Sequence, residues 1–187
     1  MKSFILRWRL VMVLVAVLVA VMAFASANPT EAATTRIPFD NINVNCVILS
    51  QTVWYSQDGT IMHIRDRVMD GAVDSDGGYH KGSTRMVANA NIDLTTGYGN
   101  YWGTLEIYPY AYPGGHWSGH WSMQVNEGKV GGIAQLKGYD ELDGLLSKSD
   151  LTPIPPPFLP TYAYLCNGNT PVSGAHAVGF TMNPGGD

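Results

Sequence analysis

The segment GHWSGHWSMQVN, residues 115–126, decides the fold of this chain. Its apolar side chains share one parity with Gly119: Trp117, Trp121, Met123 and Val125. Its polar side chains share the other parity: His116, Ser118, His120, Ser122, Gln124 and Asn126. Because successive side chains of a strand point to opposite faces, this alternation predicts a β-strand with one apolar and one polar face.

The wider region 95–145 contains further strands of the same kind. Residues 101–109 also alternate, and Gly103 and Gly119 each lie among bulky aromatic residues inside a predicted strand. Glycine in a strand interior often marks a bend or the close approach of another group. A curved sheet that closes on itself requires such positions.

Alternating runs continue along most of the chain. The predicted strands are 44–55, 60–70, 84–94, 101–109, 115–125, 130–139, 161–166 and 175–182. The proline-rich segment 147–159 is predicted to be an extended connector and not a central strand, because proline cannot donate to the sheet ladder. Alternation along nearly every strand favours a barrel over a sandwich. We therefore predict an all-β protein, an antiparallel barrel of about eight strands.

The N-terminus has the layout of a secretory signal peptide. Basic residues precede an apolar run over 10–25, and Ala25-Ser26-Ala27 is a small-x-small cleavage pattern. We predict a signal peptide over 1–27, a flexible leader over 28–40 and a single barrel domain over 41–187. Cleavage after Ala32 is the alternative. A second alternative is an uncleaved signal that anchors the chain, although its apolar run is short for a membrane span of about 20 residues.

The charge balance argues against nucleic acid as a partner. The net charge is −4, and it falls to −7 without residues 1–27, which hold three basic residues and no acidic one. Phosphate binding needs clustered Lys and Arg. The sequence also lacks a Gly-x-Ser-x-Gly elbow, a phosphate-binding glycine loop, HExxH and CxxCH, and we predict no cofactor.

Cys46 and Cys166 are the two cysteines of the chain. In an oxidising compartment outside the cytoplasm they are expected to form a disulfide. Two unrelated buried thiols are the alternative. A metal site is not predicted, because no second cysteine or histidine lies at ligand spacing near either cysteine.

Three glycine-rich motifs lie in the region 60–145. They are Gly97-x-Gly99-x3-Gly103, Gly115-x-Trp117-x-Gly119-x-Trp121, and Gly138 followed by Leu142-Asp143-Gly144-Leu145. In these motifs the chain resembles the allene oxide cyclase-like and dirigent-like barrels, in particular small secreted bacterial members. The resemblance implies an eight-stranded antiparallel barrel with an apolar cavity, often assembled as a dimer or trimer. Members of known activity are cyclases or guides for coupling reactive intermediates, and none of their catalytic residues is matched to a position here.

Four residues on predicted strands are candidates for acid–base chemistry: His63, Arg65, Asp66 and Glu106. Asp66 shares the parity of Met62 and Ile64, so we expect it to point inward. Glu106 shares the polar parity of its strand, which favours solvent. A carboxylate facing an apolar cavity would have a raised pKa, as a catalytic acid requires.

Histidines and aromatics in the same region suggest two further sites. His116 and His120 have the spacing of a helical metal pair, but on a strand four residues span about 13 Å, too far for one zinc ion. We therefore predict no metal site. Tyr101, Trp117 and Trp121 are expected to fill the core or to line an apolar pocket.

The sequence is compatible with three functions. The first is binding of a small apolar molecule inside the barrel without catalysis, which we favour. The second is a cyclase or isomerase that moulds a reactive substrate in the cavity, and the third is a structural or surface-interaction protein. One or two ionisable groups in the cavity would favour the enzyme, an apolar cavity would favour binding, and a filled interior would favour the structural role.

Overall fold

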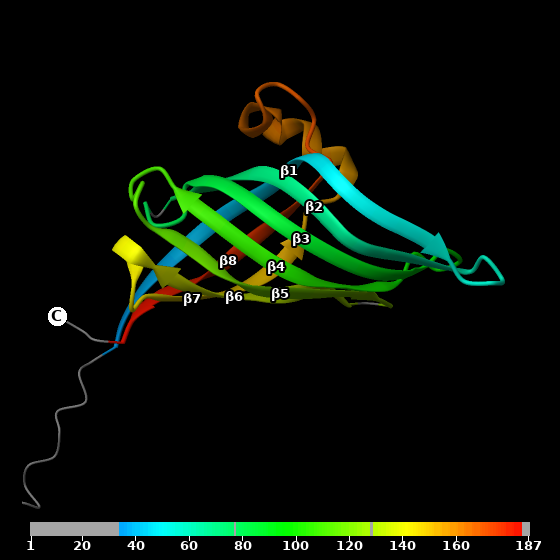
Figure 1. The fold of residues 1–187 in the computed structure, drawn as a ribbon, viewed down its shortest axis with the longest axis horizontal. Coiled ribbons are helices and arrows are strands. Elements are labelled where there is room, and N and C mark those ends of the chain that lie inside the picture. The colour runs from blue at the N-terminus through cyan, green and yellow to red at the C-terminus, as the bar shows by residue number, and fades with distance from the viewer. Residues whose placement is uncertain (1–33, 77, 128, 185–187) are drawn as a thin grey trace, which may run out of the picture. The chain divides into compact units, whose positions relative to one another are not determined.

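Eight antiparallel strands close into a barrel in the computed structural model, which describes residues 34–76, 78–127 and 129–184 (Figure 1). The strands are β1 (Thr35–Tyr55), β2 (Ile61–Ser75), β3 (Gly82–Asp93), β4 (Gly99–Pro109), β5 (His116–Asn126), β6 (Lys129–Tyr139), β7 (Leu146–Pro153) and β8 (Ser173–Asn183). Each strand pairs with the next in sequence, and β8 pairs with β1. The predicted fold class is confirmed.

The barrel closes along an unbroken ladder between β1 and β8, from the pair Thr35 and Asn183 to the pair Asn45 and Ser173. The predicted leader 28–40 is therefore too long, because β1 begins at Thr35 and residues 35–40 pair with β8. Backbone pairing with β8 and burial of Phe39 hold this stretch in the barrel. The predicted signal peptide 1–27 and the leader up to residue 33 lie outside the described residues.

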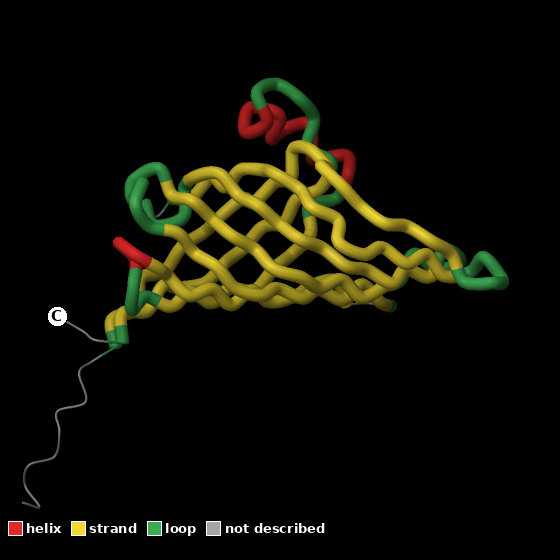
Figure 2. The backbone as a smooth tube through the Cα atoms, in the orientation of Figure 1, coloured by secondary structure: helices red, strands yellow, loops and turns green. Residues whose placement is uncertain are grey.

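Beyond Asn45, β1 leaves β8 and continues to Tyr55 alongside β2. The β1–β2 hairpin therefore projects past the other strands at one end of the barrel (Figures 1 and 2). We call this the wide end, and the opposite end, where β7 begins, the packed end.

Two predictions about the C-terminal part of the chain are wrong. The segment 147–159, expected to be a connector, contains most of β7, a central strand paired with both β6 and β8. Its proline does not break the ladder because Pro153 is the last residue of β7 and lies beyond the final pair with β6, Gly132 and Leu151.

The segment 161–166, expected to be a strand, belongs to the 3₁₀ helix η2 (Pro156–Cys166). Prolines at its first positions suit a helix start, and Asn167 in the left-handed conformation ends it. A second, shorter 3₁₀ helix, η1 (Asp140–Leu142), joins β6 to β7. Figure 2 shows both helical segments in red outside the yellow barrel wall.

The hydrophobic core fills the packed end of the barrel. It includes Trp117 and Leu142, which are almost fully buried, together with Leu105, Ile107 and Leu136. In the part of the chain that the structure describes, no helix has the length and apolarity to cross a membrane.

Candidate ligand cavity

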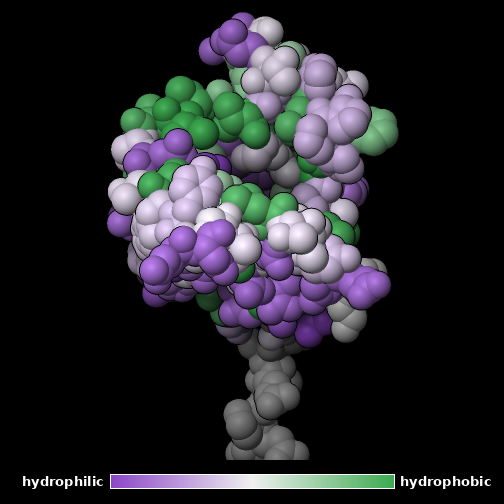
Figure 3. Space-filling view, turned by 90° about the vertical axis from the view of Figure 1, so that its right-hand side faces the viewer, coloured by the Kyte–Doolittle hydropathy of each residue, from purple (hydrophilic) through white to green (hydrophobic). Residues whose placement is uncertain are grey.

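The wide end of the barrel contains a cavity of about 460 Å³. Its wall is largely aliphatic and thioether: Met62, Ile64, Met69, Met86, Ala88, Ala90, Ile92, Leu105, Met123, Val125 and Leu151. Figure 3 faces this end of the barrel and shows apolar side chains gathered around a hollow. This volume lies in the range of pockets that hold small organic molecules.

Strand alternation places these side chains inside. In β3, Met86, Ala88, Ala90 and Ile92 face the cavity, as the predicted parity requires. Cross-strand pairing extends the inner wall, since Ala90 lies opposite Tyr101 and Tyr101 lies opposite Met123. Ala88 and Ala90 of β3 are small, and they leave space beside the larger side chains of β4 and β5.

The three predicted pocket residues divide between the two ends of the barrel. Tyr101 and Trp121 line the cavity. Trp117 instead lies in the packed end with no exposed surface, where its Nε1 donates to the carbonyl oxygen of Tyr79 at 2.8 Å. Sequence parity fixes the face of a side chain, whereas its depth along the barrel depends on strand tilt.

A β-bulge in β2 changes which residues face inward. Ile64 pairs with Ala90 and Arg67 with Ala88, so two residues of β2 oppose one residue of β3. Asp66 lies in the bulge at φ 49°, and its backbone N–H donates to Asn89 Oδ1 at 3.2 Å. Even-numbered residues of β2 face the barrel interior before the bulge, and odd-numbered residues face it after the bulge.

Asp66 is consequently exposed, and the prediction that it points inward is wrong. The bulge turns Arg67, which the sequence pattern places outside, towards the cavity wall. Arg67 Nε donates to Gln51 Oε1 at 2.7 Å. Burial lowers the pKa of Arg67, and burial also raises the pKa of Tyr101 beside it.

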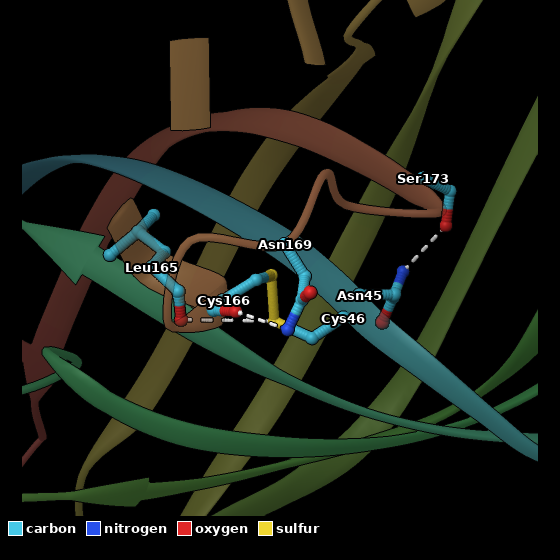
Figure 4. Close-up of a disulfide and its surroundings, with 6 residues drawn as sticks. All are labelled: Asn45, Cys46, Leu165, Cys166, Asn169 and Ser173. Carbon is cyan, nitrogen blue, oxygen red and sulfur yellow. Dashed lines mark hydrogen bonds between the residues drawn. A yellow bond between two sulfur atoms is a disulfide. The ribbon is translucent and has the colours of Figure 1, made fainter. Parts of the chain in front are cut away.

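Three asparagines of β1 form a polar row along the barrel interior: Asn41, Asn43 and Asn45. Asn43 and Asn45 line the cavity, and Asn45 Nδ2 donates to Ser173 Oγ at 2.9 Å (Figure 4). The Oδ1 atoms of all three asparagines and Trp121 Nε1 are buried without a partner among the described residues. Such atoms favour a ligand or water that completes their hydrogen bonds.

The rim of the cavity is formed by the segment between β7 and β8. Pro156 and Leu159 of η2 line the cavity, with Pro153, Ile154, Val172 and Gly174 on either side of the helix. The predicted disulfide between Cys46 and Cys166 is present and ties η2 to β1 where β1 leaves β8 (Figure 4). The bond thus fixes the rim over the opening.

No family model matches this sequence, and no curated protein or solved structure is significantly similar to it. The resemblance to allene oxide cyclase-like and dirigent-like barrels is therefore a proposal that depends on the glycine motifs and on the fold.

The remaining acid–base candidates lie on the outer wall. Glu106 accepts a hydrogen bond from the Tyr108 hydroxyl at 2.6 Å, and this bond raises the pKa of Tyr108. Arg65 lies over the rings of both Trp54 and Trp102, and His63 stacks on Trp54. Among the described residues, no carboxylate and no histidine lines the cavity.

His116 and His120 also lie on the outer face of β5. His116 packs between the rings of Tyr108 and Tyr139, with its Nδ1 3.4 Å from an oxygen of Asp140. His120 is exposed. Within residues 34–76, 78–127 and 129–184, no three His, Cys, Asp or Glu side chains come together as a metal site.

One histidine is buried in the packed end, and sequence reasoning missed it. His80 lies between the rings of Phe39 and Trp117, and its Nε2 is 3.2 Å from Ser147 Oγ. Burial lowers its pKa from 6.5 to about 4. No sequence signal marked it, because it lies between the predicted strands 60–70 and 84–94, outside the alternating runs.

Proposed function

We propose that this protein is a secreted binding protein that holds a small apolar molecule in the wide end of its barrel. The observation that carries the proposal is the cavity of about 460 Å³ with its aliphatic, methionine and aromatic wall. Burying a ligand's apolar surface there would contribute about 25 cal/mol per Å². Four methionines in the wall, Met62, Met69, Met86 and Met123, would adapt to ligands of different shape.

Secretion is supported by two independent features. The N-terminal sequence has the layout of a signal peptide, and the disulfide between Cys46 and Cys166 requires an oxidising compartment to persist. Both features agree with a ligand met outside the cytoplasm.

A cyclase or isomerase of the allene oxide cyclase-like superfamily is the second candidate. It is favoured by one observation, the presence of Arg67 and Tyr101 on the cavity wall. We place it second because arginine stays protonated and the pKa of Tyr101 is raised, so neither group is a general base near neutral pH. A purely structural barrel is favoured least, since the wide end is hollow. Dimer or trimer formation stays a prediction from the resemblance.

Titration with the neutral fluorescent probe N-phenyl-1-naphthylamine tests the proposal. We expect probe emission to increase and shift to the blue on binding, with saturation at one probe per chain. The Ala90→Phe variant fills the cavity from β3 and should weaken binding at least about tenfold, which corresponds to about 1.4 kcal/mol. Ala88→Leu provides a second, smaller filling change should Ala90→Phe fail to fold.

Two controls separate the cavity from other surfaces. Val178→Phe places the same aromatic side chain at an exposed position of β8 and should leave binding unchanged. Ile133→Ala removes a large side chain from a hollow on the outer face, lined also by Trp102 and Gln124. Loss of binding in Ile133→Ala with full binding in Ala90→Phe would place the probe outside the barrel and overturn the proposal.

A further inference from the structure

The cavity wall carries one cation that lacks an acidic partner. Arg67 is half-buried there, and its Nε is occupied by Gln51 Oε1 at 2.7 Å. The ion pairs in the described part of the chain involve Lys81, Arg85, His116 and His176, and none involves Arg67. Partial burial weakens the hydration of this guanidinium, and an anion beside it would compensate for that loss.

The acidic residues near Arg67 in sequence are held elsewhere. Asp66 is exposed on the outer face because of the bulge. Asp70 accepts hydrogen bonds from Arg85 Nε and Nη2 at 2.9 and 3.1 Å on the outer wall. The guanidinium of Arg67 is therefore not paired with either neighbouring carboxylate and is available to an anionic group in the cavity.

We infer that Arg67 binds the anionic group of the ligand, and that this ligand is an apolar molecule carrying one carboxylate. The inference rests on the proposed function, because it requires a molecule inside the cavity. The planar guanidinium offers paired N–H donors that match the two oxygens of a carboxylate. Tyr101, which lies on the same wall and interacts electrostatically with Arg67, supplies a hydroxyl donor.

The rest of the cavity favours a single negative charge on an apolar body. Besides Arg67, its wall contains no Lys, Arg or His among the described residues, so a phosphate ester with up to two negative charges would lack a second cation. From Arg67 the wall continues through Met69, Met86 and Trp121, which would contact an aliphatic or aromatic remainder. The carboxylate end would thus lie at Arg67.

The test compares dodecanoate with dodecan-1-ol, each displacing N-phenyl-1-naphthylamine at neutral pH and below its aggregation concentration. Wild-type protein should bind dodecanoate about tenfold more tightly than the alcohol, because a charge-assisted hydrogen bond contributes more than a neutral one. In Arg67→Gln this preference should fall to about twofold or less. Arg85→Gln removes the same charge from the outer wall and should keep the preference.

The outcomes distinguish this inference from the proposed function. Equal binding of acid and alcohol to wild-type protein would overturn the inference and leave the binding function standing. A preference that survives in Arg67→Gln would overturn the role of Arg67. Absence of binding for the probe and for both compounds would overturn the proposed function together with the inference.

Discussion

His80 stacks on Trp117 in the packed end of the barrel, with ring centroids 4.9 Å apart and planes inclined by 24°. Both side chains are almost fully buried, and His80 Nδ1 has no partner among the described residues. The stack fills the barrel interior at the packed end, beyond the cavity. Burial in this stack favours the neutral imidazole of His80.

Stability should therefore decrease in mild acid. The pKa of His80 is about 4 in the folded state against 6.5 in an exposed histidine, so between these values the unfolded chain binds more protons. The free energy of unfolding rises with pH across this window, by about 3 kcal/mol from this residue. The measurement is urea unfolding of wild type and His80→Gln from pH 4 to 7, taking the difference between the two proteins. A difference that is independent of pH would contradict the assignment.

Loss of the disulfide should destabilise the fold and loosen the cavity rim. Cys46 and Cys166 are 120 residues apart in sequence, and a bond that closes so long a loop contributes about 2–5 kcal/mol. We expect the Cys46→Ser/Cys166→Ser variant to unfold at lower urea concentration and to bind the naphthylamine probe more weakly. Dithiothreitol should reproduce the effect in wild type and leave the double variant unchanged. A variant as stable as wild type would show that η2 is held by packing alone.

Gly103 allows β3 and β4 to approach closely. A Cβ atom built at Gly103 lies 1.8 Å from the carbonyl oxygen of Val87, on backbone that cannot rotate away. Gly103→Ala should therefore cost about 2 kcal/mol or more. Gly78→Ala is the matched control, since its Cβ meets nothing within 4 Å. Thermal unfolding of both variants checks this, and equal melting temperatures would disprove it.

The bulge at Asp66 should tolerate glycine and reject a β-branched residue. Its φ of 49° lies in the left-handed region, where a non-glycine residue is strained and a branched one more so. Asp66→Gly should change stability by less than about 0.5 kcal/mol, and Asp66→Val should destabilise by about 1–2 kcal/mol. Urea unfolding measures both. A valine variant as stable as the glycine variant would argue against the left-handed backbone at this position.

Sequence alternation predicted the barrel and the inward face of β3 to β5, and the count of two cysteines predicted the disulfide, because these signals are local or pairwise. The alternation could not predict the bulge, since an extra residue reverses the parity without changing the composition. The inward position expected for Asp66 was wrong for this reason, and Arg67 lines the cavity in its place. Asn41, Asn43 and Asn45 also alternate in the sequence. Polar residues at the start of a predicted strand are equally typical of a flexible leader, so this alternation did not indicate an interior row. Which residues enclose empty space, such as Tyr101 but not Trp117, depends on tilt and register across all eight strands.

The central claim, an apolar binding site inside the wide end, is tested most directly by anomalous diffraction from crystals grown with 1-bromonaphthalene. The bromine peak is predicted inside the barrel, among Met69, Met86 and Trp121. A peak confined to the outer hollow beside Trp102 and Ile133, or an interior filled by side chains, would contradict the account.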